Sequence, residues 1–369
     1  MIRKQIALAA VALLLPVLYA NATEGINLIG IGPVQQGTAG AGVASAKDST
    51  WLILNPAGLT DVGRQVDASF QIFSPRRDVS YPGMGKQTDD NSFYIPSLSA
   101  SFGCCQQDNG YFGIGIYGTS GMGVDYDTSS PWLAGNMTEL SIAKMTLTYA
   151  RKLDNGWSVG AGPIFVLSRL RTDMGGNSGA WDTAVGAGAI FGVNKRVNDK
   201  LKFGASYMSE QFTSEFDEYE ALLGGSLNLP QQLTVGLAYN VLTNLELALD
   251  YRWVGWGDLN TLGDNFGWED QNIVKAGLTW QATERLTLRS GISHGNSPIG
   301  SEDAFANSLF PAIMKTHLAC GASYAFDKVS LDLAYVHALD ASESGPGPGG
   351  TTSISMYQNS LTLGARWNF

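Results

Sequence analysis

The sequence predicts an all-β protein: a 14-stranded antiparallel transmembrane β-barrel with an N-terminal hatch, or plug, inside the lumen. Three observations lead to this prediction. Charged residues make up only 15% of the chain, against about 25% in average soluble proteins. Apolar and polar residues alternate along most of the chain, and short connections alternate with long ones. The net charge of −10 excludes a basic nucleic-acid-binding protein, and no apolar run is long enough for a membrane-spanning helix.

The first 22 residues have the order of regions found in a secretory signal peptide. Two basic residues precede an apolar run, and Ala20 and Ala22 then supply the small-x-small pattern of a cleavage site. We therefore expect residues 1–22 to be removed, so that the mature chain begins at Thr23. The alternative reading is an N-terminal core helix.

Residues 23–64 lack a strand pattern and are rich in Gly and Ala. A 14-stranded barrel is too wide to be filled by its own side chains, so something must occupy the lumen. Small residues allow an irregular segment to pack tightly against the inner wall, and the apolar residues 51–54 need burial. We expect this segment to form the hatch; the alternative is a disordered periplasmic tail.

The barrel itself is expected over residues 65–369, where period-2 alternation predicts strands with one apolar face. Short links follow the even strands and long links the odd ones, as in outer-membrane barrels with tight periplasmic turns and longer extracellular loops. A soluble β-sandwich, the alternative, has no reason to segregate loop length in this way. The expected strands are 65–74, 92–103, 110–118, 138–152, 156–168, 181–195, 200–213, 230–242, 244–256, 270–283, 285–295, 312–327, 328–339 and 356–369. The expected long links are 75–91, 119–137, 169–180, 214–229, 257–269, 296–311 and 340–355.

The chain has three cysteines, Cys104, Cys105 and Cys320. Adjacent cysteines pair only with strain, and three cannot all pair within one chain. A disulfide framework is therefore excluded, and the absence of CxxC or HxxxH spacing gives no support for zinc. We expect no metal and no cofactor, and the role of the thiols stays open.

Several segments resemble the FadL-type long-chain fatty acid transporters, a family that also includes toluene and other aromatic-hydrocarbon channels. The most recognisable is the stretch from residue 37 to 59, with small residues, Asp48 and the Asn55-Pro56-Ala57 triplet. The resemblance covers essentially the whole mature chain, because further similar segments follow in order: 115–127, 153–163, 290–299, 324–337 and the terminal Phe369.

The resemblance implies passive uptake of hydrophobic molecules through the outer membrane of a Gram-negative cell. Loops gather the ligand outside, and an apolar pocket in the lumen receives it beside the mature N-terminus. By this resemblance, Gly25, Ile26 and Leu28 border the pocket, and the Asn55-Pro56-Ala57 triplet belongs to the hatch. The implied partners are the hydrophobic substrate, outer-membrane lipids and lipopolysaccharide, and the assembly machinery through Phe369, with a monomeric barrel.

In the family, a shift of the hatch releases the ligand sideways through a gap in the wall, where the third strand is kinked. Gly118, Gly121 and Gly123 lie at the end of the third expected strand. Glycine weakens and bends strands, so these residues are candidates for the kink and the lateral gate. The alternative is simple loop flexibility.

A fatty acid needs a cationic partner for its carboxylate once it leaves water. Arg169 and Arg171, at the extracellular end of the fifth expected strand, are the candidates, and they lie where the family also carries basic residues. They can equally be ordinary rim charges, and a hydrocarbon cargo needs no cation. Further possible lumen bases are Arg252, Lys275 and Arg289.

Apolar residues in the long links could form an external capture surface: residues 221–223, Met122, Trp132 and Leu133. Three other functions stay open as alternatives: a general diffusion porin, a structural or adhesive barrel, and an outer-membrane lipase. A lipase would pair a serine with a histidine. Ser293 and His294 are neighbours, but adjacent strand residues point to opposite faces. We therefore expect a protein that is not an enzyme.

Overall fold

The structure is a computed structural model that describes residues 24–104 and 109–369. The expected signal peptide, residues 1–22, lies outside the described residues, as do Thr23 and Cys105. In the described part of the chain, no helix has the length and apolar character needed to cross a membrane.

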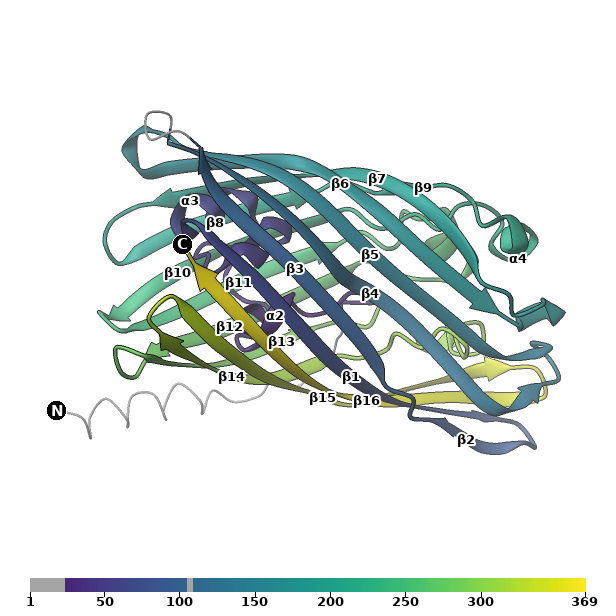
Figure 1. Ribbon diagram of the computed structural model, residues 1–369. Coiled ribbons are helices and arrows are strands. Elements are labelled where there is room, and N and C mark those ends of the chain that lie inside the picture. The colour runs from purple at the N-terminus through teal and green to yellow at the C-terminus, as the bar shows by residue number, and fades with distance from the viewer. Residues whose placement is uncertain (1–23, 105–108) are drawn as a thin grey trace.

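The chain forms one closed antiparallel sheet of strongly tilted strands (Figure 1). The sheet has 16 strands, and two of them, β2 (Gly85–Asp89) and β9 (Phe212–Thr213), are short additions that leave 14 in the wall. Pairing of β1 with β16 closes the cylinder, which confirms the predicted 14-stranded barrel. The wall strands are β1 (Gln65–Tyr81), β3 (Phe93–Cys104), β4 (Gly110–Ser130), β5 (Gly135–Lys152), β6 (Trp157–Thr172), β7 (Asp182–Arg196), β8 (Leu201–Met208), β10 (Gln232–Leu242), β11 (Leu245–Val254), β12 (Gln271–Gln281), β13 (Leu286–Gly295), β14 (Thr316–Phe326), β15 (Val329–Gly347) and β16 (Gly350–Asn368).

Side chains alternate between the two faces of the wall. On β6, Ile164 and Val166 are buried inside, whereas Phe165 and Leu167 are exposed on the outer face. Exposed Leu, Phe, Val and Tyr side chains recur at the outward positions of the other strands. An outer surface of this kind is apolar enough to face lipid, and closure of the sheet pairs the backbone groups that hydrocarbon cannot solvate.

Three of the links predicted to be long loops are wrong in extent. Much of 75–91, 119–137 and 340–355 continues as strand in β1, β2, β4, β5, β15 and β16. Several residues at both faces of these extensions are exposed, among them Asp127, Thr128 and Ser129. An extension without one apolar face gives no alternation of apolar and polar residues, so the sequence predicted strands that end before those of the structure.

Residues 24–64 carry four short helical elements: α2 (Gly32–Gln36), η1 (Ser49–Ile53), η2 (Pro56–Gly58) and α3 (Leu59–Val62). They lie inside the barrel, behind the front wall in Figure 1. Helix α2 packs against β14, β15, β16 and β1, η1 against β3 and β4, and η2 against β6 and β7. We call residues 24–64 the hatch.

At the opposite end of the barrel, long connections fold inward and bury aromatic side chains. Trp256 and Trp268 make an edge-to-face contact with ring centroids 5.0 Å apart, and Phe266 and Phe310 make a similar one at 5.1 Å. These connections fill the end of the barrel that the hatch does not. Their helical elements are η5 (Asp217–Tyr219), α4 (Glu220–Leu223), the π-helical η6 (Asn260–Asn265) and η7 (Ser301–Asp303); η3 (Asp154–Gly156) and η4 (Met174–Gly176) occupy shorter links.

Candidate functional site: the hatch, the lumen cavity and a gap in the wall

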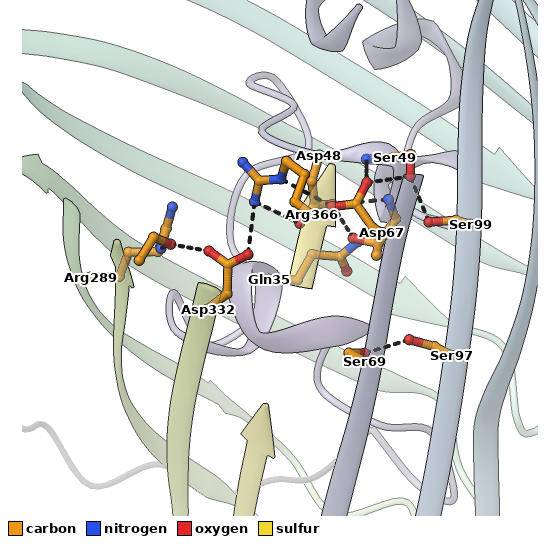
Figure 2. A network of polar contacts seen from close by, with 12 residues as sticks. Gln35, Asp48, Ser49, Asp67, Ser69, Ser97, Ser99, Arg289, Asp332 and Arg366 are labelled. Carbon is orange, nitrogen blue, oxygen red and sulfur yellow. Dashed lines mark hydrogen bonds and ion pairs between the residues drawn. The ribbon is translucent and has the colours of Figure 1, made fainter. Parts of the chain in front are cut away.

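A buried polar network joins the body of the hatch to the wall (Figure 2). Arg366 on β16 forms ion pairs with Asp67 on β1 at 3.0 Å, Asp332 on β15 at 3.4 Å and Asp48 of the hatch at 3.6 Å. Ser49 completes the link, because its backbone N–H donates to Asp67 at 3.0 Å and its hydroxyl lies 2.7 Å from that of Ser99. Three strands and the hatch therefore meet at Arg366, and Ser49 extends the network to β3.

This network places three carboxylates around Arg366. Burial raises the pKa of Asp48 to about 7, and the nearby Asp67 carboxylate adds to the rise although Arg366 opposes it. Near neutral pH, Asp48 is therefore partly protonated. Partial protonation relieves repulsion among the carboxylates.

The Asn55-Pro56-Ala57 triplet anchors the hatch to the opposite wall. The Asn55 side chain accepts from Ala57 N at 3.1 Å, and its amide donates to Val43 O and to Asn194 Oδ1, each at 2.8 Å. Asn194 lies on β7. The triplet thus holds η2 against β7, away from the cavity described below.

Glycines on the inner wall make room for the hatch. A Cβ at Gly113 would lie 2.3 Å from Leu52, and one at Gly192 would lie 2.0 Å from Asn55. A Cβ at Gly160 would meet the Pro56 backbone at 2.6 Å. These small residues therefore accommodate hatch side chains and backbone.

The start of the hatch is held by a buried charge cluster. Glu24 forms ion pairs with Arg252 on β11 and Lys275 on β12, and both side chains belong to the lumen bases expected from the sequence. Gly25 follows with φ of 61°, and a Cβ there would lie 2.5 Å from the Trp256 ring. Only glycine fits this turn without strain.

The next residues pair with β4. Leu28 N donates to Thr119 O at 3.0 Å, and Gly121 N donates to Ile26 O at 3.0 Å. Between these two bonds, the Ser120 hydroxyl donates to Asn27 Oδ1 at 2.8 Å. Residues 26–28 thus pair with β4 through an isolated antiparallel bridge between Asn27 and Ser120.

Strand β4 is irregular at this point. Its ladder with β5 pairs Gly118 with Ala143 and then Ser120 with Ile142, so Thr119 is the extra residue of a β-bulge. A bulge bends its strand and increases the local twist. The bulge falls within the run from Gly118 to Gly123, the part of the third wall strand for which the resemblance implied a kink.

A gap opens in the wall beside this bulge. Pairing of β3 with β4 ends at Ser97 and Tyr117, although β3 itself starts at Phe93 and β4 runs on to Ser130. The ladder stops next to Pro96, which has no N–H to donate. Beyond the gap, β4 is joined again, because Asp125 N donates to Asp89 of the β2 strand at 2.8 Å. We call this interruption the wall gap; its β4 edge, residues 118–124, is about 20 Å long.

The three candidate gate glycines lie along the β4 edge of the wall gap. A Cβ at Gly118 would approach Ile95 of β3 to 2.4 Å, and one at Gly123 would lie 3.4 Å from the Phe93 ring. Gly121 donates to the hatch through its backbone. Larger residues at these positions would therefore narrow the wall gap or push β3 and β4 apart.

A cavity of about 490 Å³ lies between the hatch and the wall gap. Its inner surface comes from the hatch residues 25–29, including Gly25, Ile26 and Leu28, and from inward residues such as Met122, Ile142 and Val336. Its lining also includes side chains that alternate to the outer face, such as Tyr94 and Leu167. The cavity therefore touches both faces of the wall at the gap.

Arg169 and Arg171 lie on the outward face of β6, because the intervening Leu170 is buried. Arg169 belongs to the cavity lining, and its guanidinium lies 4.5 Å from the centroid of the Trp181 ring. Arg171 lies over the same ring at 4.9 Å but pairs with Glu139 at 2.8 Å. The structure thus brings Arg169 to the outer mouth of the cavity and gives Arg171 a carboxylate partner.

Other candidates from the sequence lie in different surroundings. Arg289 is buried on β13 and donates to Ser323 Oγ at 2.6 Å. Of the expected capture surface, Met122 lies on β4 and lines the cavity, and Leu133 is buried in the turn between β4 and β5. Trp132 is half-exposed against Tyr81, with ring centroids 6.0 Å apart.

Sequence reasoning missed Glu24, Asn27, Thr119 and His317. Glu24 meets its partners from more than 220 positions away, and a bulge within a glycine-rich run leaves no side-chain pattern to read. His317 follows the start of β14 and lines the cavity, which single-sequence alternation alone does not reveal. Its inward position could have been assigned only with the strand boundaries known.

The described residues thus form a closed β-barrel with a hatch in its lumen and a cavity at its wall. The family model described as Outer membrane protein transport protein (OMPP1/FadL/TodX) matches residues 182–345. The chain is 21% identical over 361 residues to the Long-chain fatty acid transport protein of Salmonella typhi, covering 80% of this chain and 82% of that one. It is 22% identical over 307 residues to Outer membrane protein P1 of Haemophilus influenzae, covering 66% and 65%.

Solved structures show the same fold. The toluene transporter TodX of P. putida superposes with a TM-score of 0.75 at 18% identity, covering 93% of this chain and 99% of that one. A FadL homologue of Pseudomonas aeruginosa gives a TM-score of 0.76 at 15% identity, covering 94% and 100%. These structures show the fold, and the family model and the curated relatives name the same FadL-type proteins that the sequence segments resemble.

Proposed function

We propose that this protein carries hydrophobic molecules, long-chain fatty acids or related hydrocarbons, passively across the outer membrane. Extracellular loops gather the ligand, the lumen cavity binds it beside hatch residues 25–29, and the wall gap releases it sideways. The fold and the family match support an outer-membrane transport protein. The relatives' names, a long-chain fatty acid transport protein and a toluene transporter, support the class of cargo.

One observation carries the proposal: the cavity is lined by side chains from both faces of the wall, at the place where β3 and β4 are not paired. An apolar ligand gains about 0.8 kcal/mol for each CH₂ that stays out of water. Release straight into the periplasm would lose this gain, whereas lateral transfer into the bilayer keeps it. A path through the wall is therefore the energetically favoured exit.

The movement that opens this path is proposed to be confined to residues 24–28. The rest of the hatch is docked through the Arg366 network and through Asn55. Residues 26–28 are held at β4 by two backbone hydrogen bonds and one side-chain bond. Displacing this short segment frees the β4 edge of the wall gap, widens its connection with the cavity, and leaves the hatch body in place.

Deletion of residues 23–35 tests whether this segment is needed. We expect the variant to lose uptake of toluene and of oleate, because the inner surface of the cavity and the contact with β4 are both removed. The barrel should still assemble, since the wall strands pair with one another and not through this segment. The measurement is uptake of radiolabelled substrate by cells, with heat-modifiable migration on gels as the control for folding. Unchanged uptake would count against gating by the hatch.

Replacing Arg169 and Arg171 by Ala separates two kinds of cargo. We expect weaker fatty acid binding but unchanged toluene binding, because only the carboxylate gains from a cation at the mouth of the cavity. Arg169→Ala alone should account for most of the loss, since Arg171 is paired with Glu139. Binding is measured on the purified protein with oleate and toluene. Equal loss for both ligands would refute the carboxylate role.

The remaining partners are also proposals. The exposed apolar outer face fits outer-membrane lipids and lipopolysaccharide, the terminal Phe369 fits recognition by the assembly machinery, and a closed wall needs no second copy. Removal of residues 1–22 as a signal peptide belongs to the same proposal. A general diffusion porin is less compatible with this arrangement, because the hatch and the inward-folded loops occupy the two ends of the lumen.

A further inference from the structure

Apart from Arg77, whose charge is paired with Asp89, two uncharged side chains on the lumen side of the cavity each contain a buried polar atom that no described residue satisfies. They are Nδ1 of His317 on β14 and Nδ2 of Asn27 in the hatch. Both residues line the cavity, and His317 is only 2% exposed. A buried polar group without a partner costs about 1–3 kcal/mol, so an arrangement with two of them at one cavity needs an explanation.

The bonds already made by these side chains define what is left for a ligand. The Asn27 oxygen accepts from Ser120, so its free amide hydrogens can donate. His317 forms a side-chain hydrogen bond with Gln358, and because Nδ1 has no partner this bond uses Nε2. In the neutral tautomer whose Nε2–H donates to Gln358, Nδ1 is an acceptor. These two residues of the cavity lining thus leave one donor and one acceptor unpaired.

The cations around this part of the cavity are already neutralised. Arg77 is the inward-facing cation of the described cavity lining, and it pairs with buried Asp89 at 2.7 Å. Its Nε and Nη1 are free to donate, but a ligand carboxylate there would meet the Asp89 charge. Glu24 of the hatch forms ion pairs with Lys275 and Arg252 of the wall. A carboxylate bound at this inner part of the cavity, away from Arg169 at the outer mouth, would therefore be an uncompensated charge in a buried site.

We propose that the cavity selects uncharged hydrophobic compounds that carry a hydroxyl group, such as phenols and alcohols, with His317 and Asn27 as the residues that bind the hydroxyl. A hydroxyl is both donor and acceptor. It donates to His317 Nδ1 and accepts from Asn27 Nδ2, while the apolar body lies against Ile26, Leu28 and Val336. This inference rests on the proposed function and names its preferred cargo.

The test uses three probes of one shape: p-cresol, p-xylene and p-toluate, which differ by a hydroxyl, a methyl and a carboxylate. Their binding to the full-length protein in lipid nanodiscs is measured by calorimetry, for wild type and for His317→Phe, Asn27→Leu and His294→Phe. His294 is the matched control, because its Nδ1 bonds Thr316 Oγ1 at 3.1 Å and it does not line the cavity. Comparing ratios between variants cancels the partitioning of each probe into lipid.

We expect the ratio of p-cresol to p-xylene affinity to fall about 5- to 10-fold in His317→Phe, as for the loss of one buried hydrogen bond. Asn27→Leu should lower the same ratio, which keeps the test valid if His317→Phe does not fold. His294→Phe should keep the wild-type ratio, p-xylene should bind all folded variants alike, and p-toluate should bind wild type more weakly than p-cresol. An unchanged ratio in the folded His317 and Asn27 variants, or tighter binding of p-toluate than p-cresol, would overturn the inference while leaving hydrophobic uptake intact. No binding of either neutral probe would overturn the proposed function as well.

Discussion

A disulfide between positions 27 and 120 is expected to stop uptake of hydrophobic cargo, and its reduction is expected to restore it. Asn27 and Ser120 face each other between two backbone hydrogen bonds, Leu28 N to Thr119 O and Gly121 N to Ile26 O. They are therefore a non-hydrogen-bonded antiparallel pair, in which the Cα atoms lie about 4.5 Å apart. This spacing is within the range that a disulfide bridges.

The effect should be large because the link ties the proposed moving segment to the edge of the wall gap. Asn27→Cys and Ser120→Cys are combined in a background with Cys104, Cys105 and Cys320 replaced by Ser. Toluene uptake by cells is measured after oxidation and again after reduction. We expect uptake at the level of cells without the protein in the first case, and recovery in the second.

A second cysteine pair shows whether the whole hatch moves. The hydroxyls of Ser49 and Ser99 lie 2.7 Å apart where the hatch body meets β3, so Ser49→Cys with Ser99→Cys links the two elsewhere. We expect transport to continue under oxidation in this control. Loss of transport in both oxidised pairs would contradict a movement confined to residues 24–28, and full transport in the oxidised 27–120 pair would contradict hatch gating altogether.

The barrel was predictable because apolar residues alternate with polar or small residues along each strand of its wall. On strands such as β11, Leu245, Leu247 and Leu249 alternate with polar or small residues, and a membrane requires one apolar face on every strand. The hatch was predictable for a related reason, since residues 51–54 are apolar without alternation and need burial. Short turns also marked strand ends clearly, as at 153–156 between β5 and β6.

The site was less predictable because its parts come from distant positions or lack a side-chain signal. Ion pairing of Glu24 with Lys275 depends on closure of the barrel. The bulge at Thr119 lies among glycines, which carry no pattern. The face of Arg169 was undecidable from the sequence, because the neighbouring residues Val166 to Leu170 are largely apolar at both inward and outward positions.

Removal of the bulge is the second large effect that we expect. Thr119 is the one residue of its stretch that the β4–β5 ladder skips. Deleting it restores a continuous register, straightens β4 and lets residues 118–123 approach Phe93–Pro96 of β3. The wall gap should then close by added strand pairing. The control is Thr119→Ala, which keeps the chain length, the bulge and the carbonyl that accepts from Leu28.

The most direct measurement of lateral release is therefore a comparison of uptake and binding in the Thr119 deletion and in Thr119→Ala. Toluene uptake is followed in cells, and p-xylene binding is measured on the purified, folded proteins. The account predicts that the deletion abolishes uptake but retains binding, whereas Thr119→Ala retains both. Full uptake by a folded deletion variant with a continuous β4–β5 ladder would show that the cargo does not leave through the wall.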